Sequence, residues 1–318
     1  MALLLTACSF ASQPVAQVRG TQPGTRLSPT LTGSLAAQPE TTEEAQPASV
    51  AALSPAPDTP DSQPTARPTL APDAWKDLPV IPEVSQRARE IYQRGLARGN
   101  YPQRFSKVGD CQNVSSYFLG IYEQADEYEL GSEYAHLQVT IDFYAGSFSR
   151  ESYAVKGGYN VAAILTPMRA DPKACSKNQS PLDCELADWQ PSIALVSLEE
   201  WWADRPVDEY AAYLDRAVTI MVDNGTLPIL ATRAGNTPHV YALNDAIARV
   251  AHQHDVPLWN FWGAIQHLPN RGLTEDGFHL TFARNVFDDP ARMKSAWPWR
   301  NLTALQVLDV VHRELTTP

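Results

Sequence analysis

Hydrophobic and polar positions follow two different periods in the last two hundred residues, and each period predicts one type of element. Apolar residues at helical spacing predict helices at about 82–99, 207–223, 240–254 and 301–315. Short apolar runs predict strands at about 104–108, 193–196 and 227–232 and a strand or strand end at 257–262, and residues 114–119 read as the opening of a further helix. Because strands separated by helices form βαβ units, the pattern predicts an α/β fold: a three-layer α/β/α sandwich with a central parallel sheet.

The first part of the chain lacks this patterning. Residues 9–73 consist largely of Pro, Thr, Ser, Ala and Gln, whereas all eight tryptophans lie further on. Such a composition buries too little apolar surface to offset chain entropy. We therefore expect a disordered linker at residues 9–73 and one folded domain at residues 74–318.

The extreme N-terminus carries a possible processing signal. Leu5-Thr6-Ala7-Cys8 resembles the lipobox of bacterial lipoproteins, in which the chain is cut before a cysteine that is then acylated. Residues 1–8 lack a positive segment and a full apolar stretch, so either the start lies inside a longer signal or the match is chance. We favour the first. The linker would then tether the domain to a bacterial membrane through a lipid on Cys8, at the cell surface or otherwise outside the cytoplasm.

Cysteine spacing agrees with that compartment. Of the four cysteines, Cys175 and Cys184 lie nine residues apart in a polar segment whose residues 171–173 and 180–183 read as turns. We predict a disulfide between them, which implies an oxidising environment; the alternative is two loop thiols.

The net charge of the chain limits the kinds of molecule that it is expected to bind. The formal charge of −11 and the pI of about 5.1 argue against a nucleic-acid partner, which requires a basic face. A metal site is not expected, because His252 and His254 stand two apart and do not face each other on a helix. No cofactor motif is present, and we expect none.

Two short segments carry candidate chemistry. In Asp276-Gly277-Phe278-His279, the carboxylate precedes the imidazole by three residues and can hold one ring nitrogen while the other acts as a base. Upstream, the Gly109-Asp110-Cys111 turn follows a predicted strand and can present a thiol nucleophile.

These segments resemble the first and last blocks of the SGNH (GDSL-type) hydrolases, with Cys111 in place of the nucleophilic serine. The resemblance implies a flavodoxin-like α/β/α fold, ester hydrolysis through an acyl-enzyme, and a catalytic set of Cys111, His279 and Asp276. Lys156-Gly157-Gly158-Tyr159-Asn160 is similar to the second block, which implies an oxyanion role for the Gly158 N–H and makes Asn160 a candidate side-chain donor. At the third block the family's asparagine is absent, and Glu199 stands there. An ionised Glu199 would repel the oxyanion, whereas a protonated one would donate to it.

The functional hypothesis is a surface esterase or acyl-hydrolase acting on an ester of a glycan or a small acyl substrate. The alternatives are an inactive SGNH-fold module that binds a glycan and a lipid-anchored scaffold with no ligand. Cys111 has the further readings of an inert buried thiol or a substitution that ended activity. Trp201 and Trp202 beside Glu199 and Glu200 either form a sugar-stacking groove or pack in the core.

Overall fold

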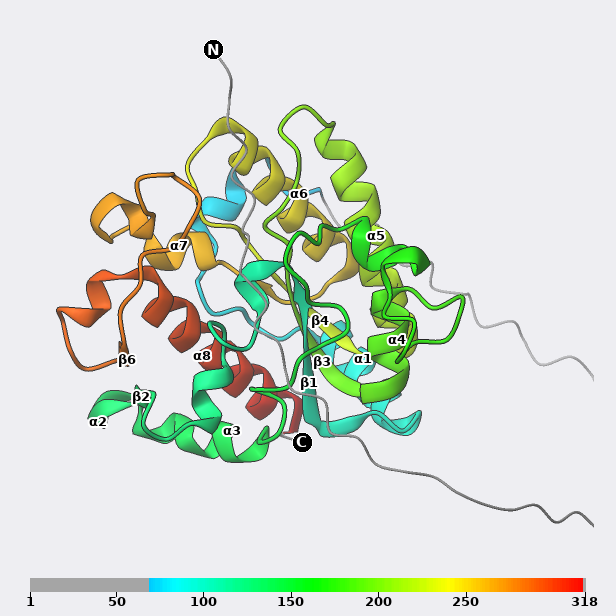
Figure 1. The fold of residues 1–318 in the computed structure, drawn as a ribbon, viewed down its shortest axis with the longest axis horizontal. Coiled ribbons are helices and arrows are strands. Elements are labelled where there is room, and N and C mark those ends of the chain that lie inside the picture. The colour runs from blue at the N-terminus through cyan, green and yellow to red at the C-terminus, as the bar shows by residue number, and fades with distance from the viewer. Residues whose placement is uncertain (1–68, 317–318) are drawn as a thin grey trace, which may run out of the picture. The chain divides into compact units, whose positions relative to one another are not determined.

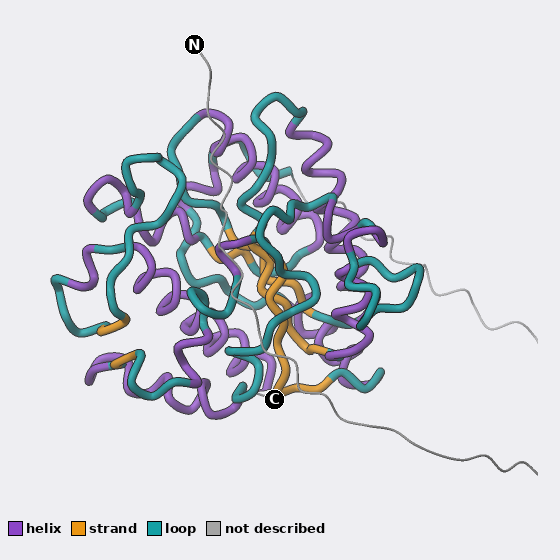
Figure 2. The backbone as a smooth tube through the Cα atoms, viewed as in Figure 1, coloured by secondary structure: helices purple, strands orange, loops and turns teal. Residues whose placement is uncertain are grey.

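A four-stranded parallel sheet forms the centre of the domain in this computed structural model, which describes residues 69–316. The strands lie in the order β1-β3-β4-β5, and Figure 2 shows them grouped in the middle of the helices. Their bounds are Tyr101–Gly109 (β1), Pro191–Ser197 (β3), Leu227–Ala231 (β4) and Leu258–Trp259 (β5). This arrangement confirms the predicted α/β fold with a central parallel sheet.

The segment before Lys156 extends the sheet beyond β1. Gly109 forms a parallel bridge with Val155, in which the Gly109 N–H donates to the Ala154 carbonyl at 3.0 Å and the Lys156 N–H donates to the Gly109 carbonyl at 3.3 Å. These bonds place the glycine-rich segment after Lys156 beside the end of β1.

Helices cover both faces of the sheet. Three helices, α4 (Pro181–Trp189), α5 (Val207–Asn224) and α6 (Pro238–His254), connect strands that follow one another in the same direction, so right-handed crossovers place these helices on one face. On the other face α1 (Gln86–Ala97) lies beside α8 (Ala296–Thr316), since Arg89 pairs with Glu314 at 2.6 Å. Figure 1 shows α8 and α3 (Gln138–Phe143) on one side of the strands, with α4 and α5 on the other.

The helices have the following bounds: Gln86–Ala97 (α1), Gly131–Tyr134 (α2), Gln138–Phe143 (α3), Pro181–Trp189 (α4), Val207–Asn224 (α5), Pro238–His254 (α6), Phe261–Ile265 (α7) and Ala296–Thr316 (α8). Two further short strands, Tyr128–Glu129 (β2) and Asn285–Val286 (β6), pair in parallel away from the central sheet. The four predicted helices correspond to α1, α5, α6 and α8, and all are confirmed to within a few residues, except that α8 begins five residues earlier than predicted.

Two local predictions are wrong. Residues 114–119 form turns rather than a helix, and Leu119 adopts a left-handed φ of 66°. The predicted turn at 180–183 is the start of α4, where Ser180 and Asp183 form a capping box. The strand or strand end predicted at 257–262 contains β5, which ends at Trp259 because the Asn260 side chain accepts the Gly263 N–H and begins α7.

The described residues cover the predicted domain except for its last two residues and also include residues 69–73 of the predicted linker; Trp75 near their start is completely buried. Cys8, the predicted signal remnant at residues 1–8 and nearly all of the linker at residues 9–73 lie outside the described residues. Between residues 69 and 316, no helix has both the length and the apolar character to cross a bilayer.

Gly95 is required where α1 meets the turn after α5. A Cβ at Gly95 would lie 2.0 Å from the Gly225 carbonyl oxygen, and backbone cannot yield as a flexible side chain can. We predict that Gly95→Ala lowers the free energy of unfolding by about 1–3 kcal/mol in urea denaturation, although alanine is the better helix former. Gln93→Ala on the exposed side of the same helix is the control and should change it by less than about 0.5 kcal/mol. Equal effects of the two substitutions would contradict the close approach.

Candidate active site

Two predicted site residues, Cys111 and Glu199, lie at the carboxyl ends of central strands together with Arg233, which was not predicted. Cys111 follows the end of β1, Glu199 follows the end of β3, and Arg233 follows the end of β4. In parallel α/β sheets this edge is where ligands bind, because the loops after neighbouring strands converge there.

Asp276 and His279 form the predicted acid–base pair. The Asp276 Oδ2 lies 2.5 Å from the His279 Nδ1, and Oδ1 accepts the N–H groups of Phe278 at 2.9 Å and His279 at 3.0 Å. Thr274 adds a hydroxyl donor at 2.6 Å. The bond to His279, followed by these donors, lowers the pKa of Asp276 well below its usual value. The carboxylate therefore stays ionised and fixes the imidazole with Nε2 available for proton transfer.

Asp110 ties the Cys111 turn to the loop after β3. It is fully buried, its Oδ1 accepts the Gln112 N–H at 3.0 Å, and its Oδ2 accepts the N–H groups of Glu199 at 2.5 Å and Glu200 at 3.1 Å. Burial and, next, the neighbouring Glu199 carboxylate raise the pKa of Asp110 to about 7. Asp110 is thus a positioning group.

Cys111 is partly exposed and opens a short 3₁₀ turn at Cys111–Asn113. Its Cβ lies 3.8 Å from the position that a Cβ on Gly157 would occupy, so the glycine-rich segment passes directly beside it. Burial lowers the pKa of the Arg300 guanidinium, and the nearby charges of Glu199, Asp110 and, least, Cys111 oppose that shift. Arg300 therefore lies within electrostatic range of the Cys111 thiol.

Glu199 lies between two buried guanidinium groups. Its Oε1 is 3.4 Å from Arg300 Nη1 and accepts the Ser197 hydroxyl at 2.9 Å, and its Oε2 is 3.4 Å from Arg233 Nε. The carboxyl group is only 2% exposed, and both of its oxygens accept hydrogen bonds. In this geometry the Glu199 carboxylate pairs with both arginines, which argues against Glu199 donating a hydrogen bond to an oxyanion.

The other two oxyanion candidates differ in placement. Gly158 is exposed with a φ of 79°, and no atom lies within 4 Å of the Cβ position there. The Asn160 side chain is buried, and its Oδ1 accepts the N–H groups of Ala162 and Ala163 at 3.1 and 3.0 Å. The amide oxygen therefore points to the backbone, and the amide nitrogen can bond to other partners.

A cavity of about 350 Å³ lies beside the acid–base loop, and Cys111, Asp276, His279 and Gly158 are not among the residues that line it. Gly277 and Phe278 of the acid–base loop line it together with residues after β3 and β4; the full lining is Asn160, Glu199, Glu200, Trp201, Trp202, Arg233, Thr237, His239, Val240, Gly277 and Phe278. Of the two tryptophans, Trp201 is buried against Tyr210, whereas Trp202 is 54% exposed. Trp201 therefore packs in the core, whereas Trp202 does not.

Sequence analysis missed Arg233 and Arg300. Arg233 had a usable signal, since a charged residue directly after a buried parallel strand points to the ligand edge. Arg300 had none, because its place inside α8 and its burial against Phe118, Trp259 and Phe261 arise only from tertiary packing.

The predicted disulfide is confirmed. Cys175 and Cys184 are bonded, and the bond joins the loop before α4 to its first turn. Among residues 69–316, no cluster of three or more His, Cys, Asp or Glu is arranged to hold a metal.

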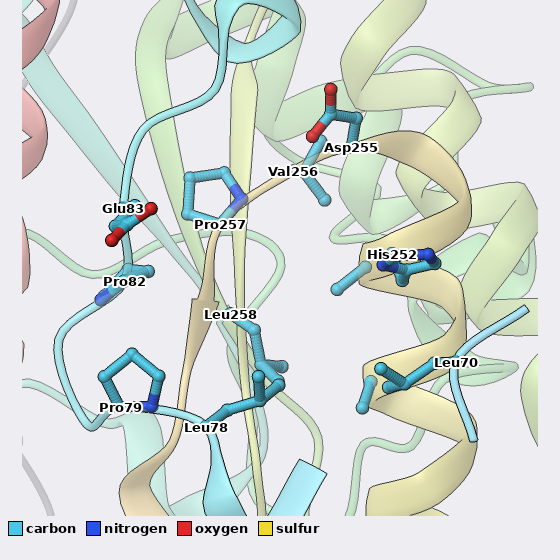
Figure 3. Close-up of a pocket in the computed structure, with 12 residues that line it drawn as sticks. Leu70, Leu78, Pro79, Pro82, Glu83, His252, Asp255, Val256, Pro257 and Leu258 are labelled. Atoms are coloured by element: carbon cyan, nitrogen blue, oxygen red, sulfur yellow. The ribbon is translucent and has the colours of Figure 1, made fainter. Parts of the chain in front are cut away.

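Another cavity, of about 320 Å³, lies at the opposite edge of the sheet, where β5 begins. Figure 3 shows its leucine and proline lining, with Glu83, His252 and Asp255 around it. It borders none of the predicted catalytic residues.

No family model and no curated protein matches the sequence. The solved structures it resembles include LAE5, an alpha/beta hydrolase from the metagenome of Lake Arreo in Spain, at 14% identity, over 65% of this chain and 95% of that one, with a TM-score of 0.42. A GDSL-like lipase from Bacteroides thetaiotaomicron is 13% identical over 70% of this chain and 97% of its own, with a TM-score of 0.41. A lipase/acylhydrolase from Enterococcus faecalis is 15% identical over 66% and 96%, also at 0.41. These likenesses are remote, and the function proposed below rests on the site itself.

The raised pKa of Asp110 predicts a pH effect on stability. The folded chain binds this proton more tightly than the unfolded chain, so the contribution of Asp110 to the free energy of unfolding falls as pH rises from about 4 to about 7. We expect the difference in unfolding free energy, wild type minus Asp110→Asn, to decline across that interval in urea denaturation and to be flat above it. A difference that grows with pH would show that the folded state prefers the ionised form.

Proposed function

We propose that this chain hydrolyses esters through a thiol nucleophile. The observation that carries the proposal is the bonded Asp276–His279 pair, whose loop lines the same cavity as the residues after β3 and β4, with Cys111 at the same edge of the sheet. An oriented imidazole and a nucleophile at the ligand edge of a parallel sheet are the parts that acyl transfer requires.

The reaction proceeds in two halves. The Cys111 sulfur attacks the acyl carbon, the C=O electron pair moves to oxygen, and His279 Nε2 takes the thiol proton. The intermediate collapses to a thioester as His279 returns the proton to the leaving alcohol oxygen. Water then attacks the thioester, His279 takes its proton and delivers it to the departing sulfur, and the acid product leaves.

The oxyanion needs donors other than the missing asparagine. In this proposal the N–H groups of Cys111 and Gly158 and the amide nitrogen of Asn160 supply them. Arg300 and Arg233 offset the charge of Glu199, so the loop after β3 does not oppose the developing negative oxygen through an uncompensated carboxylate.

The test is hydrolysis of p-nitrophenyl acetate by the full chain. We expect Cys111→Ala and His279→Ala to lower kcat/KM by about 10³-fold or more, and Asp276→Asn by about 10²–10⁴-fold because the ring loses its orienting charge. Cys111→Ser shows whether the site accepts oxygen in place of sulfur.

His136→Ala is the matched control, since His136 is exposed and remote from the strand ends. It should leave the rate unchanged, and melting temperatures should show that all variants fold. If the wild type folds but shows no hydrolysis above background, thiol-dependent hydrolysis of simple acetates is excluded. That result would favour the non-catalytic glycan-binding module, which is supported by the absence of the family's asparagine at the position of Glu199.

The proposal includes a location and a substrate class: a lipid-anchored protein outside the cytoplasm of a bacterium, tethered through Cys8, acting on an ester of a glycan. The Cys175–Cys184 bond supports the location, because such bonds persist in oxidising compartments.

The disulfide should contribute to stability in that setting. Since it closes a short loop in the unfolded chain, the double variant Cys175→Ser/Cys184→Ser is expected to lose about 2–3 kcal/mol of unfolding free energy in urea. Reductant should destabilise the wild type by a similar amount and leave the double variant unchanged. If reductant has no effect on the wild type, the bond is absent from the folded protein and the support for the location is lost.

A further inference from the structure

The cavity beside the acid–base loop contains polar atoms that the protein leaves unused. Arg233 Nη1 and His239 Nε2 are buried and have no hydrogen-bond partner among residues 69–316, and both side chains line this cavity. The Arg233 side chain is only 6% exposed. A buried guanidinium N–H without a partner costs free energy, so a ligand acceptor there would be strongly favoured.

The charges around the cavity favour an anion. Two guanidinium groups share the single carboxylate of Glu199, and Asp110 retains its proton up to about neutral pH. Thr237 and His239 lie at the N-terminus of the 17-residue α6, where the helix dipole is positive. Glu200 is the opposing charge, but it is partly exposed, where solvent screens it.

Flat aromatic surface lies next to these charges. Trp202 is exposed and Phe278 is partly exposed, and both line the cavity. The hydroxyl of Thr237 and the amide of Asn160 provide donors and acceptors at its wall. A sugar ring matches this combination, because its C–H face packs on an aromatic ring while its hydroxyls bond to polar groups.

We propose that this cavity binds an acidic sugar whose carboxylate pairs with Arg233 while its ring lies against Trp202. The inference rests on the proposed function, since the cavity adjoins the loop of His279, and it narrows the substrate class to esters of glycans that carry carboxylates. The volume of about 350 Å³ falls in the range of about 300–1,000 Å³ that is usual for small-ligand sites.

The test is calorimetric titration of the full chain with methyl β-D-glucuronide and methyl β-D-glucoside, which differ in the carboxylate. Because neither compound is an ester, the result is independent of hydrolysis. We expect the glucuronide to bind at least about tenfold more tightly, the effect of one charge-assisted pair. Glucose 6-phosphate distinguishes the anion: tighter binding than the glucuronide would overturn the carboxylate assignment.

Variants locate the binding group. Arg233→Met should abolish the preference for the glucuronide, and Arg233→Lys should keep only part of it, because a lysine retains the charge without the paired N–H groups. Arg205→Met is the matched control: Arg205 lies 5.5 Å from the Trp202 ring centroid but is exposed and does not line the cavity. Three results would each overturn the proposal: Arg205→Met loses the preference for the glucuronide, Arg233→Met keeps it, or the wild type binds both sugars equally. If Arg233→Met does not fold, the sugar preferences of the wild type and of Arg233→Lys test the proposal.

Discussion

The candidate site depends on the hydrogen bonds that the carboxyl group of Asp110 accepts. This carboxyl group accepts N–H groups from the Cys111 turn and from the loop after β3, so one buried side chain fixes two loops that follow neighbouring strands. Gly109 makes this possible, because any Cβ there would lie 2.3 Å from the Ser197 carbonyl oxygen. The position of the Cys111 turn therefore depends on the register of β1 and β3.

The buried arginines follow from the same constraint. The hydrogen bond from the Glu199 N–H to Asp110 holds Glu199 at the sheet edge, where its carboxyl group has no access to water. A buried carboxylate requires a positively charged partner. Arg233 and Arg300 provide that pairing, and the rings of Phe118, Trp259 and Phe261 around Arg300 supply further favourable contacts for its charge. Loss of both arginines would leave the buried Glu199 carboxylate without a compensating charge, and Arg300 links this carboxylate to the packing of α8.

Local signals in the sequence account for what could be predicted. Helical periodicity identified α5 and α6, short apolar runs identified the central strands, and the three-residue spacing of Asp276 and His279 was enough to predict their bond because the contact forms within one turn. The failures lie where local signals compete or are absent. Ser180-Pro181 reads as a turn and as a helix start alike, and only the bond between Ser180 and Asp183 separates the two. The burial of Arg300 depends on residues that are distant in the sequence, such as Glu199, so the residues around Arg300 in the sequence do not predict it.

Asp276 and His279 belong to one turn of the chain, and nearly every bond that orients His279 comes from within Thr274–His279. The imidazole would keep its orienting carboxylate even if the whole turn shifted over the sheet edge. The orientation of the ring and its distance from Cys111 are thus separate properties: the bonds within the turn determine the first, and the contacts of Leu273 with Leu280 and of Thr281 with Gly272 at the base of the turn determine the second. A substitution at the base of the turn can therefore move the imidazole relative to the thiol without changing how Asp276 holds it.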